Sequence, residues 1–184
     1  LELFQLYFYG TTISASKIKH ILKKRPDDNT ISSFISYLIV FWDSFQSSFT
    51  ELHEYLSRET ATAANDYRDM QTGGNIIFRP VSLLQMIKAI AYIKTVNHNI
   101  STLDILSRYN AIDRNVSSGL WTNIIWNANT KKMIVNNQII LKYLFVYIYD
   151  KAILRQKHLE EFYQKYAFVK NISIDIVDEE LRQY

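Results

Sequence analysis

The chain has 184 residues, a length typical of one domain whose core needs no disulfide or metal to hold it. Hydrophobic residues make up 48% of it and charged residues 21%, which is typical of globular rather than disordered proteins. The absence of cysteine excludes disulfide scaffolds, thiolate zinc sites, iron–sulfur clusters and cysteine nucleophiles. A net charge of +3 is too small to indicate nucleic-acid binding by itself. Any argument for nucleic-acid binding therefore depends on where the cations lie in the chain.

Glycine and proline are scarce, with 4 and 2 residues, whereas the many tight turns of a β-sandwich or barrel need more of both. The first ten residues lack the basic start and small-residue cleavage site of a signal peptide. The longest apolar stretch, residues 139–149, is shorter than the roughly 20 residues that cross a membrane. We therefore expect a mainly α-helical, cytoplasmic protein with no membrane partner. Because the chain begins with Leu1 rather than Met, we expect a fragment of a longer protein.

The N-terminal third of the chain contains its clearest helical period. Residues 1–9 are apolar and fit either a short helix or a strand, and a helix is predicted over residues 15–24 after a capping serine. Apolar residues at steps of three and four then predict one long amphipathic helix over residues 31–56, with Ile35 and Trp42 in its core-facing stripe. Residues 59–75 are polar and include Gly73-Gly74, which predicts a loop with a glycine linker.

The remaining elements follow in turn. Ser82 and Gln85 form the S-x-x-Q pattern of a capping box, which predicts a helix to about residue 96, and a shorter helix is expected over residues 101–109. Apolar runs on both sides of residues 127–132 fit two short strands and a turn, with a helix-turn as the alternative. Further helices are predicted over residues 138–149, capped by Asn137, and over residues 152–166.

Together these elements predict a mainly α fold. We expect a single helical domain over residues 1–184, with about six or seven helices arranged around segments 31–56 and 138–149. A small β-hairpin near residues 120–135 is an optional addition to this fold, because a helix-turn also fits the same residues.

Residues with catalytic or metal-binding potential do not form a known constellation. The four histidines lack the short paired spacing of a zinc site, and the glycine motifs of nucleotide-binding and hydrolase folds are missing. We therefore expect no cofactor, no metal and no catalytic residue in this fragment. An enzyme site assembled from Asp66, Arg68 and Arg79 is the least favoured alternative.

The strongest functional signal is a group of cations. It lies in the helix predicted over residues 15–24, where phosphate contacts would be independent of nucleotide sequence and sensitive to salt. The alternative is a solvated helix face whose cations stabilise the helix dipole. A second, weaker pair lies in the turn after residue 130. The predicted nucleic-acid-binding residues are Lys17, Lys19, Lys23, Lys24, Arg25, Lys131 and Lys132.

Two stretches resemble a known family. Phe78-Arg79-Pro80, leading into an apolar helix, resembles the "FRP" segment of DGQHR-domain proteins, the relatives of DndB that are associated with bacterial DNA phosphorothioation. The segment from Trp121 to Trp126, followed by Lys132-Met133-Ile134, is similar to a W-x-x-x-x-W, polar turn, (K/R)-M-I stretch of the same proteins. The resemblance covers residues 77–149. The D-G-Q-H-R motif itself is missing here, so no active-site residue is carried over.

The resemblance implies a helical, non-catalytic C-terminal region that follows a ParB-like domain. The expected function is then bacterial DNA modification of the phosphorothioation type, its regulation or phage defence, in which the fragment contacts DNA, binds a protein partner or positions the missing domain. Within the family, Pro80 would set the start of its helix and Arg79 would pair with a carboxylate. The alternative function is a protein-interaction or self-association module that does not bind nucleic acid and presents Tyr143, Tyr147 and Tyr149 to its partner.

Overall fold

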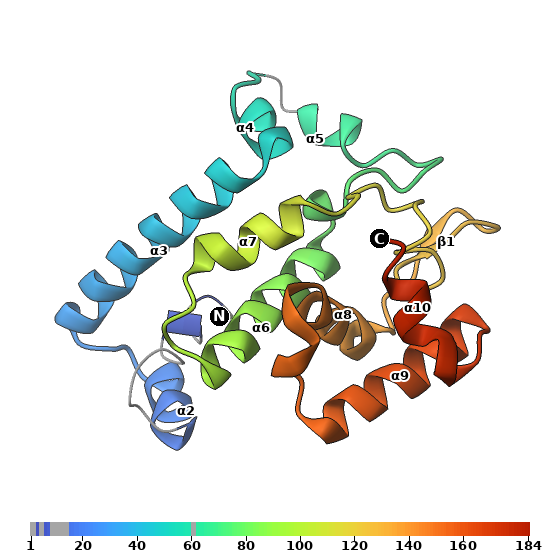
Figure 1. The fold of residues 1–184 in the computed structure, drawn as a ribbon. Helices are drawn as coiled ribbons and strands as arrows, with labels where there is room; N and C mark the ends of the chain where they lie inside the picture. The colour runs from blue at the N-terminus through green and yellow to red at the C-terminus, as the bar shows by residue number, and fades with distance from the viewer. Residues whose placement is uncertain (1–2, 4–5, 8–14, 60–61) are drawn as a thin grey trace.

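The computed structural model describes residues 3, 6–7, 15–59 and 62–184, and this part of the chain is mainly helical (Figure 1). Most of the apolar segment 1–9 lies outside the described residues, and Leu3, Leu6 and Tyr7 within it are helical. In chain order the elements are α2 (Ala15–Lys23), α3 (Asp28–Ser48), α4 (Thr50–Leu56), α5 (Ala63–Asp66), η1 (Ile76–Phe78), α6 (Pro80–Val96), α7 (Thr102–Asn110), β1 (Trp126–Asn127), β2 (Lys132–Met133), α8 (Gln138–Asp150), η2 (Lys151–Ile153), α9 (Gln156–Lys170), η3 (Ile174–Ile176) and α10 (Val177–Leu181).

Helices α6 and α8 form the centre of the molecule, and α7 and α9 both pack against α8 (Figure 1). Ile90 and Ile93 of α6 and Leu144 and Phe145 of α8 are completely buried in one hydrophobic cluster. Helix α3 lies at the edge of this arrangement, along α7. The predicted mainly α fold is confirmed. None of the described helices is both long enough and apolar enough to cross a membrane.

The long helix predicted over residues 31–56 is in fact two helices, so that prediction is wrong. The chain becomes extended at Phe49, with φ −127° and ψ 107°, between α3 and α4. Phe49 is fully buried, and its ring lies 5.0 Å from the ring of Phe45. Because the break buries a large aromatic side chain in the core, packing overrides the local helical period.

Helix α6 begins three residues earlier than the predicted cap at Ser82 implies, with Pro80 at the first helical position, where its fixed φ and missing N–H are tolerated. Ser82 and Gln85 do not form a capping box. Both side chains are buried, and the Gln85 amide donates to the Gln138 side chain across 3.1 Å. Gln85 therefore belongs to the contact between α6 and α8, whereas the buried Ser82 hydroxyl has no hydrogen-bond partner among the described residues. The capping prediction is wrong.

The small hairpin is confirmed and the helix-turn alternative is wrong. β1 pairs antiparallel with β2, with Trp126 opposite Met133. The preceding residues 120–125 are turns rather than a strand, although Leu120 and Trp121 are buried in the core. The Asn137 side chain does not cap α8, because it donates to the carbonyls of Asn123 and Ile124 in those turns.

Helix α9 begins at Gln156 rather than at residue 152 and continues to Lys170. The residues before it form the separate η2 turn, which Asp150 caps by accepting from the Ala152 backbone N–H. Asn171 ends α9 in the left-handed conformation, with φ 55°, a conformation that asparagine tolerates better than most residues. The C-terminal α10 then folds back against α9.

Candidate functional site

The cations predicted to bind nucleic acid fall into two groups at opposite ends of the molecule. Helix α2 and the β1–β2 hairpin lie on opposite sides in Figure 1. Lys23, Lys24 and Arg25 are exposed at the end of α2, whereas the side chains of Lys17 and Lys19 lie outside the described residues. The two groups therefore cannot contact the same short stretch of nucleic acid.

Two of these cations already have partners. Arg25 Nη2 lies 2.7 Å from Asp28 Oδ1 at the beginning of α3, and both side chains are largely exposed. In the hairpin turn, the Lys131 ammonium donates to the Gln71 side chain, while Lys132 is exposed. Exposed ion pairs of this kind are weak and exchange readily with other anions. Contact with phosphate by either group stays a prediction.

The glycine pair is a packed turn and not a free linker, so that prediction is wrong. Gly73 and Gly74 have φ 80° and 68°, in the region that favours glycine. A Cβ atom at Gly74 would lie 2.1 Å from the carbonyl oxygen of Tyr67, and one at Gly73 would lie 2.8 Å from Val116. The loop before η1 is therefore held tightly against its neighbours.

The arginines of this loop have structural roles. Arg79 Nε donates to the Gly73 carbonyl over 2.7 Å, and the same guanidinium also reaches the Asp69 carbonyl. The Arg79 pKa is lowered by burial and by the nearby Arg68. Arg68 Nε donates to the Phe78 carbonyl over 2.8 Å. The expected carboxylate partner of Arg79 is thus wrong, because backbone carbonyls occupy its guanidinium.

The candidate enzyme site is not assembled either. Asp66 pairs at 2.5 Å with Arg58, and the side chains are 66% and 41% exposed. Arg68 and Arg79 lie near each other, but carbonyl oxygens engage both of them and Asp66 pairs with Arg58, so the three residues do not form one site.

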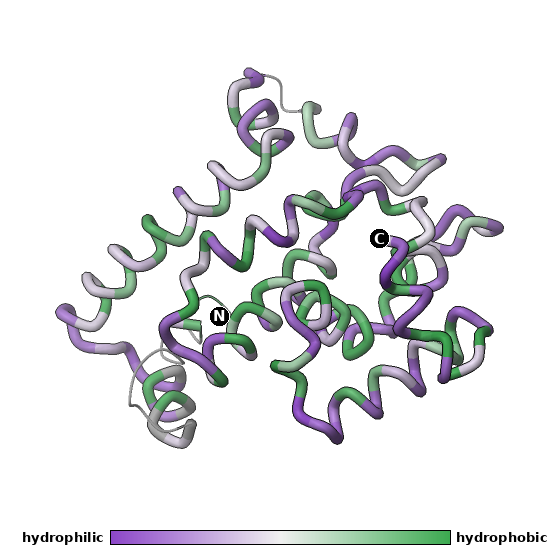
Figure 2. The backbone as a smooth tube through the Cα atoms, in the orientation of Figure 1, coloured by the Kyte–Doolittle hydropathy of each residue, from purple (hydrophilic) through white to green (hydrophobic). Residues whose placement is uncertain are grey.

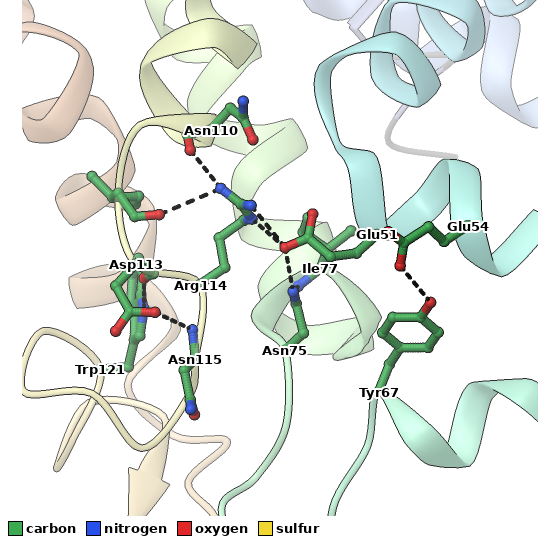
Figure 3. Close-up of polar contacts among 11 residues, drawn as sticks. Glu51, Glu54, Tyr67, Asn75, Ile77, Asn110, Asp113, Arg114, Asn115 and Trp121 are labelled. Carbon is green, nitrogen blue, oxygen red and sulfur yellow. Dashed lines mark hydrogen bonds and ion pairs between the residues drawn. The ribbon is translucent and has the colours of Figure 1, made fainter.

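A polar cleft of about 330 Å³ lies where α4, the start of η1 and the loop after α7 meet. Arg114 Nη2 and Nε donate to one Glu51 oxygen over 2.7 and 3.0 Å, and the Asn75 amide donates to the same oxygen over 3.1 Å (Figure 3). The second Glu51 oxygen is buried without a hydrogen-bond partner among the described residues. The lining residues are Glu51, Gly74, Asn75, Ile112, Asp113, Arg114 and Asn115.

The side chains in this cleft hold separate segments of the chain together. The Arg114 guanidinium also donates to the carbonyls of Asn110 and Ile112, and its charge is neutralised by Glu51 (Figure 3). The pair joins residues 63 apart, so no local spacing in the sequence could reveal it. No three or more histidine or acidic side chains of the described residues are grouped in a way that could hold a metal ion.

One exposed apolar surface is the outer face of α3, which comprises Ile35, Ile39, Val40 and Trp42. These side chains are 49%, 55%, 65% and 39% exposed, and Figure 2 shows the hydrophobic positions along this peripheral helix. The only charged residues of α3 are Asp28 and Asp43. The prediction that Ile35 and Trp42 face the core is therefore wrong, because Phe41 and Phe45 occupy the buried side.

The aromatic surface predicted on α8 is also wrong. Tyr143 is only 5% exposed. The Tyr147 and Tyr149 hydroxyls each donate over 2.6 Å, to Asp178 and Asp104. These tyrosines connect α8 to α10 and α7, so they are not presented to a partner.

Comparison with known proteins adds no relative. No family model matches the chain, and neither does any curated protein or solved structure compared with it.

Proposed function

We propose that this chain is a non-catalytic binding module whose protein partner covers the outer face of α3. The exposure of Ile35, Ile39 and Trp42 carries the proposal. These residues are spaced four and three apart, so they form one stripe on the helix. Full burial of a large aliphatic side chain is worth about 1.5–3 kcal/mol, and a contiguous exposed apolar patch is typical of an interaction site.

The chemistry of the face favours a protein over nucleic acid. Helix α3 contains no lysine or arginine, so it offers no cation to a phosphate backbone. The Trp42 ring stacks on Phe45 with centroids 5.8 Å apart, which holds the indole in place before any partner arrives. Rigid aromatic side chains of this kind are enriched among the residues that dominate protein interfaces.

Site-specific photo-crosslinking tests this function. A photo-crosslinking phenylalanine analogue would replace Ile39 in the full chain, expressed in its native host, and the matched control would carry it at Thr130 in the hairpin turn. Thr130 is exposed in the turn between β1 and β2, and this hairpin lies across the molecule from α3 in Figure 1. We expect a protein adduct from position 39 and none from position 130. Equal or absent labelling at the two positions would refute a binding role for α3.

The resemblance to DGQHR-domain proteins supplies a cellular setting for this proposal. We propose that the module serves bacterial DNA modification, its regulation or phage defence, beside a domain that carries the family motif. Deletion of the module from its parent gene is then expected to change DNA modification or phage resistance. The same phenotype should follow from Ile39→Glu if the α3 contact is what the parent needs.

DNA contact is a second candidate, favoured by three consecutive exposed cations, Lys23, Lys24 and Arg25. Salt-dependent fluorescence anisotropy with a labelled duplex tests it. If these cations neutralise three phosphates, the log–log salt dependence should have a slope of about −2.7. Reversal of all three to glutamate should abolish that slope. Charge reversal at Lys131 and Lys132 tests the hairpin separately. If the unmodified protein does not bind DNA at low salt, DNA contact by both groups of cations is excluded.

A further inference from the structure

We infer that the partner of the outer face of α3 is a second copy of this chain, with the two α3 helices packed antiparallel about a two-fold axis near Ile39. The inference rests on the proposed function and names its partner. It depends on two properties of α3: the spacing of residues along its exposed side and the distribution of charge from one end to the other.

The spacing is that of a helix-pairing seam. Ser32, Ile35, Ile39, Trp42 and Gln46 follow one another at intervals of three, four, three and four residues. This alternation is the a/d pattern by which two helices pack side by side. The large apolar residues occupy the middle of the seam and the polar ones its ends. A helix of 21 residues is about 31 Å long, enough for several turns of continuous contact.

The seam is self-complementary about its centre. With the axis at Ile39, each copy presents Ile39 to its equivalent, and Ile35 of one copy lies near Trp42 of the other. Ser32 and Gln46 are each seven residues from Ile39, so they also become partners. Two-fold contacts of this isologous kind are the commonest arrangement in soluble oligomers.

The charges favour the antiparallel orientation. Lys23, Lys24 and Arg25 precede α3, and these three cations outnumber by one the two anions at its beginning, Asp27 and Asp28. Anions outnumber cations over residues 43–59, and Asp43, Glu54 and Glu59 are exposed there. Antiparallel packing brings unlike ends together and also opposes the two helix dipoles, whereas parallel packing would bring like ends together. The seam residues themselves are uncharged, and with the axis at Ile39 the exposed Asp43 beside Trp42 stands opposite the uncharged Ile35 of the second copy.

Single cysteines give a direct test, because the chain has none of its own. Ile39→Cys in the full chain should form an interchain disulfide under mild oxidation in either orientation. Ser32→Cys mixed with Gln46→Cys should form a mixed disulfide only in the antiparallel dimer. Ser32→Cys alone should link to itself only in a parallel one. Thr130→Cys in the hairpin turn controls for random collisions.

Sedimentation equilibrium gives the matching measurement without cysteine. Ile39→Glu should raise the dimer dissociation constant by about 100-fold or more, because the symmetry places the charge in the interface twice. Val135→Glu, at a residue that is 55% exposed outside α3, should leave the dimer intact. Unchanged circular dichroism would show that both variants fold.

The outcomes separate this inference from the function on which it rests. A chain that stays monomeric and forms no Ile39→Cys disulfide overturns the second copy. If position 39 still photo-crosslinks a different protein, the binding role of α3 survives that failure. The absence of any adduct from position 39 overturns both the second copy and the binding role of α3. Efficient self-linking of Ser32→Cys overturns the antiparallel arrangement in favour of a parallel one.

Discussion

Helices α3 and α8 are both strongly apolar and nearly uncharged, yet the fold uses them in different ways. Helix α8 packs against α6, α7 and α9 and buries Leu144, Phe145 and Val146 completely. Helix α3 is covered on one side only, where Phe41 and Phe45 face the core, and it leaves its outer face in solvent. The comparison shows that a high apolar content predicts a helix that must bury part of its surface. How many other helices of the chain pack against it decides how much apolar surface stays exposed for a partner.

Truncation of the α8 core should have the largest effect on stability. Phe145→Ala would remove a fully buried ring whose centroid lies 5.0 Å from Tyr109 and 5.6 Å from Trp121. We expect a loss of about 3–5 kcal/mol in the free energy of unfolding, because the cavity adds to the lost transfer energy. Urea denaturation followed by circular dichroism measures it. A loss below about 1 kcal/mol would mean that Phe145 in α8 is no better packed than the outer face of α3.

The ion pair that joins α4 to the loop after α7 should matter less. Arg114→Ala would leave the Glu51 carboxylate, whose side chain is 24% exposed, without its charged partner. We expect a loss of about 2 kcal/mol in the free energy of unfolding, typical of hydrogen bonds to charged groups.

The pair Arg25–Asp28 provides the matched control for this prediction. Its side chains are 77% and 83% exposed, so Arg25→Ala should cost less than about 0.5 kcal/mol. Equal losses for the two arginine variants would show that the Glu51 site is as solvated as the surface of α2.

The contact between α8 and α10 gives a pH dependence. Burial raises the pKa of the Asp178 carboxyl, but hydrogen bonds from Lys151, Tyr147 and Tyr163 outweigh it and hold the pKa at about 2. A depressed pKa stabilises the fold above the unfolded value of 3.8, and this stabilisation is lost as the pH falls toward 2. We expect about 1 kcal/mol after solvent screening, since the side chain is 31% exposed.

Thermal unfolding of the protein and of Asp178→Asn across pH 2–6 measures this contribution. The two proteins should differ most near pH 6 and converge as the pH approaches 2. Parallel curves over the whole range would contradict a charged Asp178 in the folded state.

The sequence predicted the features that depend on neighbouring residues, such as the helices. It missed the features that depend on contacts between residues far apart in the chain. The helices α6, α7 and α8 follow from their apolar periods, and Ser101 caps α7 as the sequence predicts. The capping roles predicted for Ser82 and Asn137 are wrong, because the surroundings of both side chains depend on the rest of the fold. The break at Phe49 has no local marker, because it arises from burial of the ring in the core. The pairing of Glu51 with Arg114 joins residues 63 apart.

The candidate site was missed for the same physical reason. A stripe of apolar residues predicts which side chains avoid water, but not which of two apolar sides of α3 the chain itself covers. Ile35 and Trp42 belong to the same helical period as Phe41 and Phe45, and the packing of the rest of the chain, including α7, separates the exposed pair from the buried one.

The smallest expected effect is on the outer face itself. Ile39 is 55% exposed, and alanine is the better helix former, so Ile39→Ala should change the free energy of unfolding of the dilute monomer by no more than about 0.5 kcal/mol. Phe45→Ala, six residues along the same helix and on its buried side, should cost about 3–5 kcal/mol. Repeating both titrations at high protein concentration sharpens the comparison, because a dimer adds stability by mass action that Ile39→Ala would then remove. A large loss for Ile39→Ala in the dilute protein would mean that the chain itself covers α3, leaving no face for a partner.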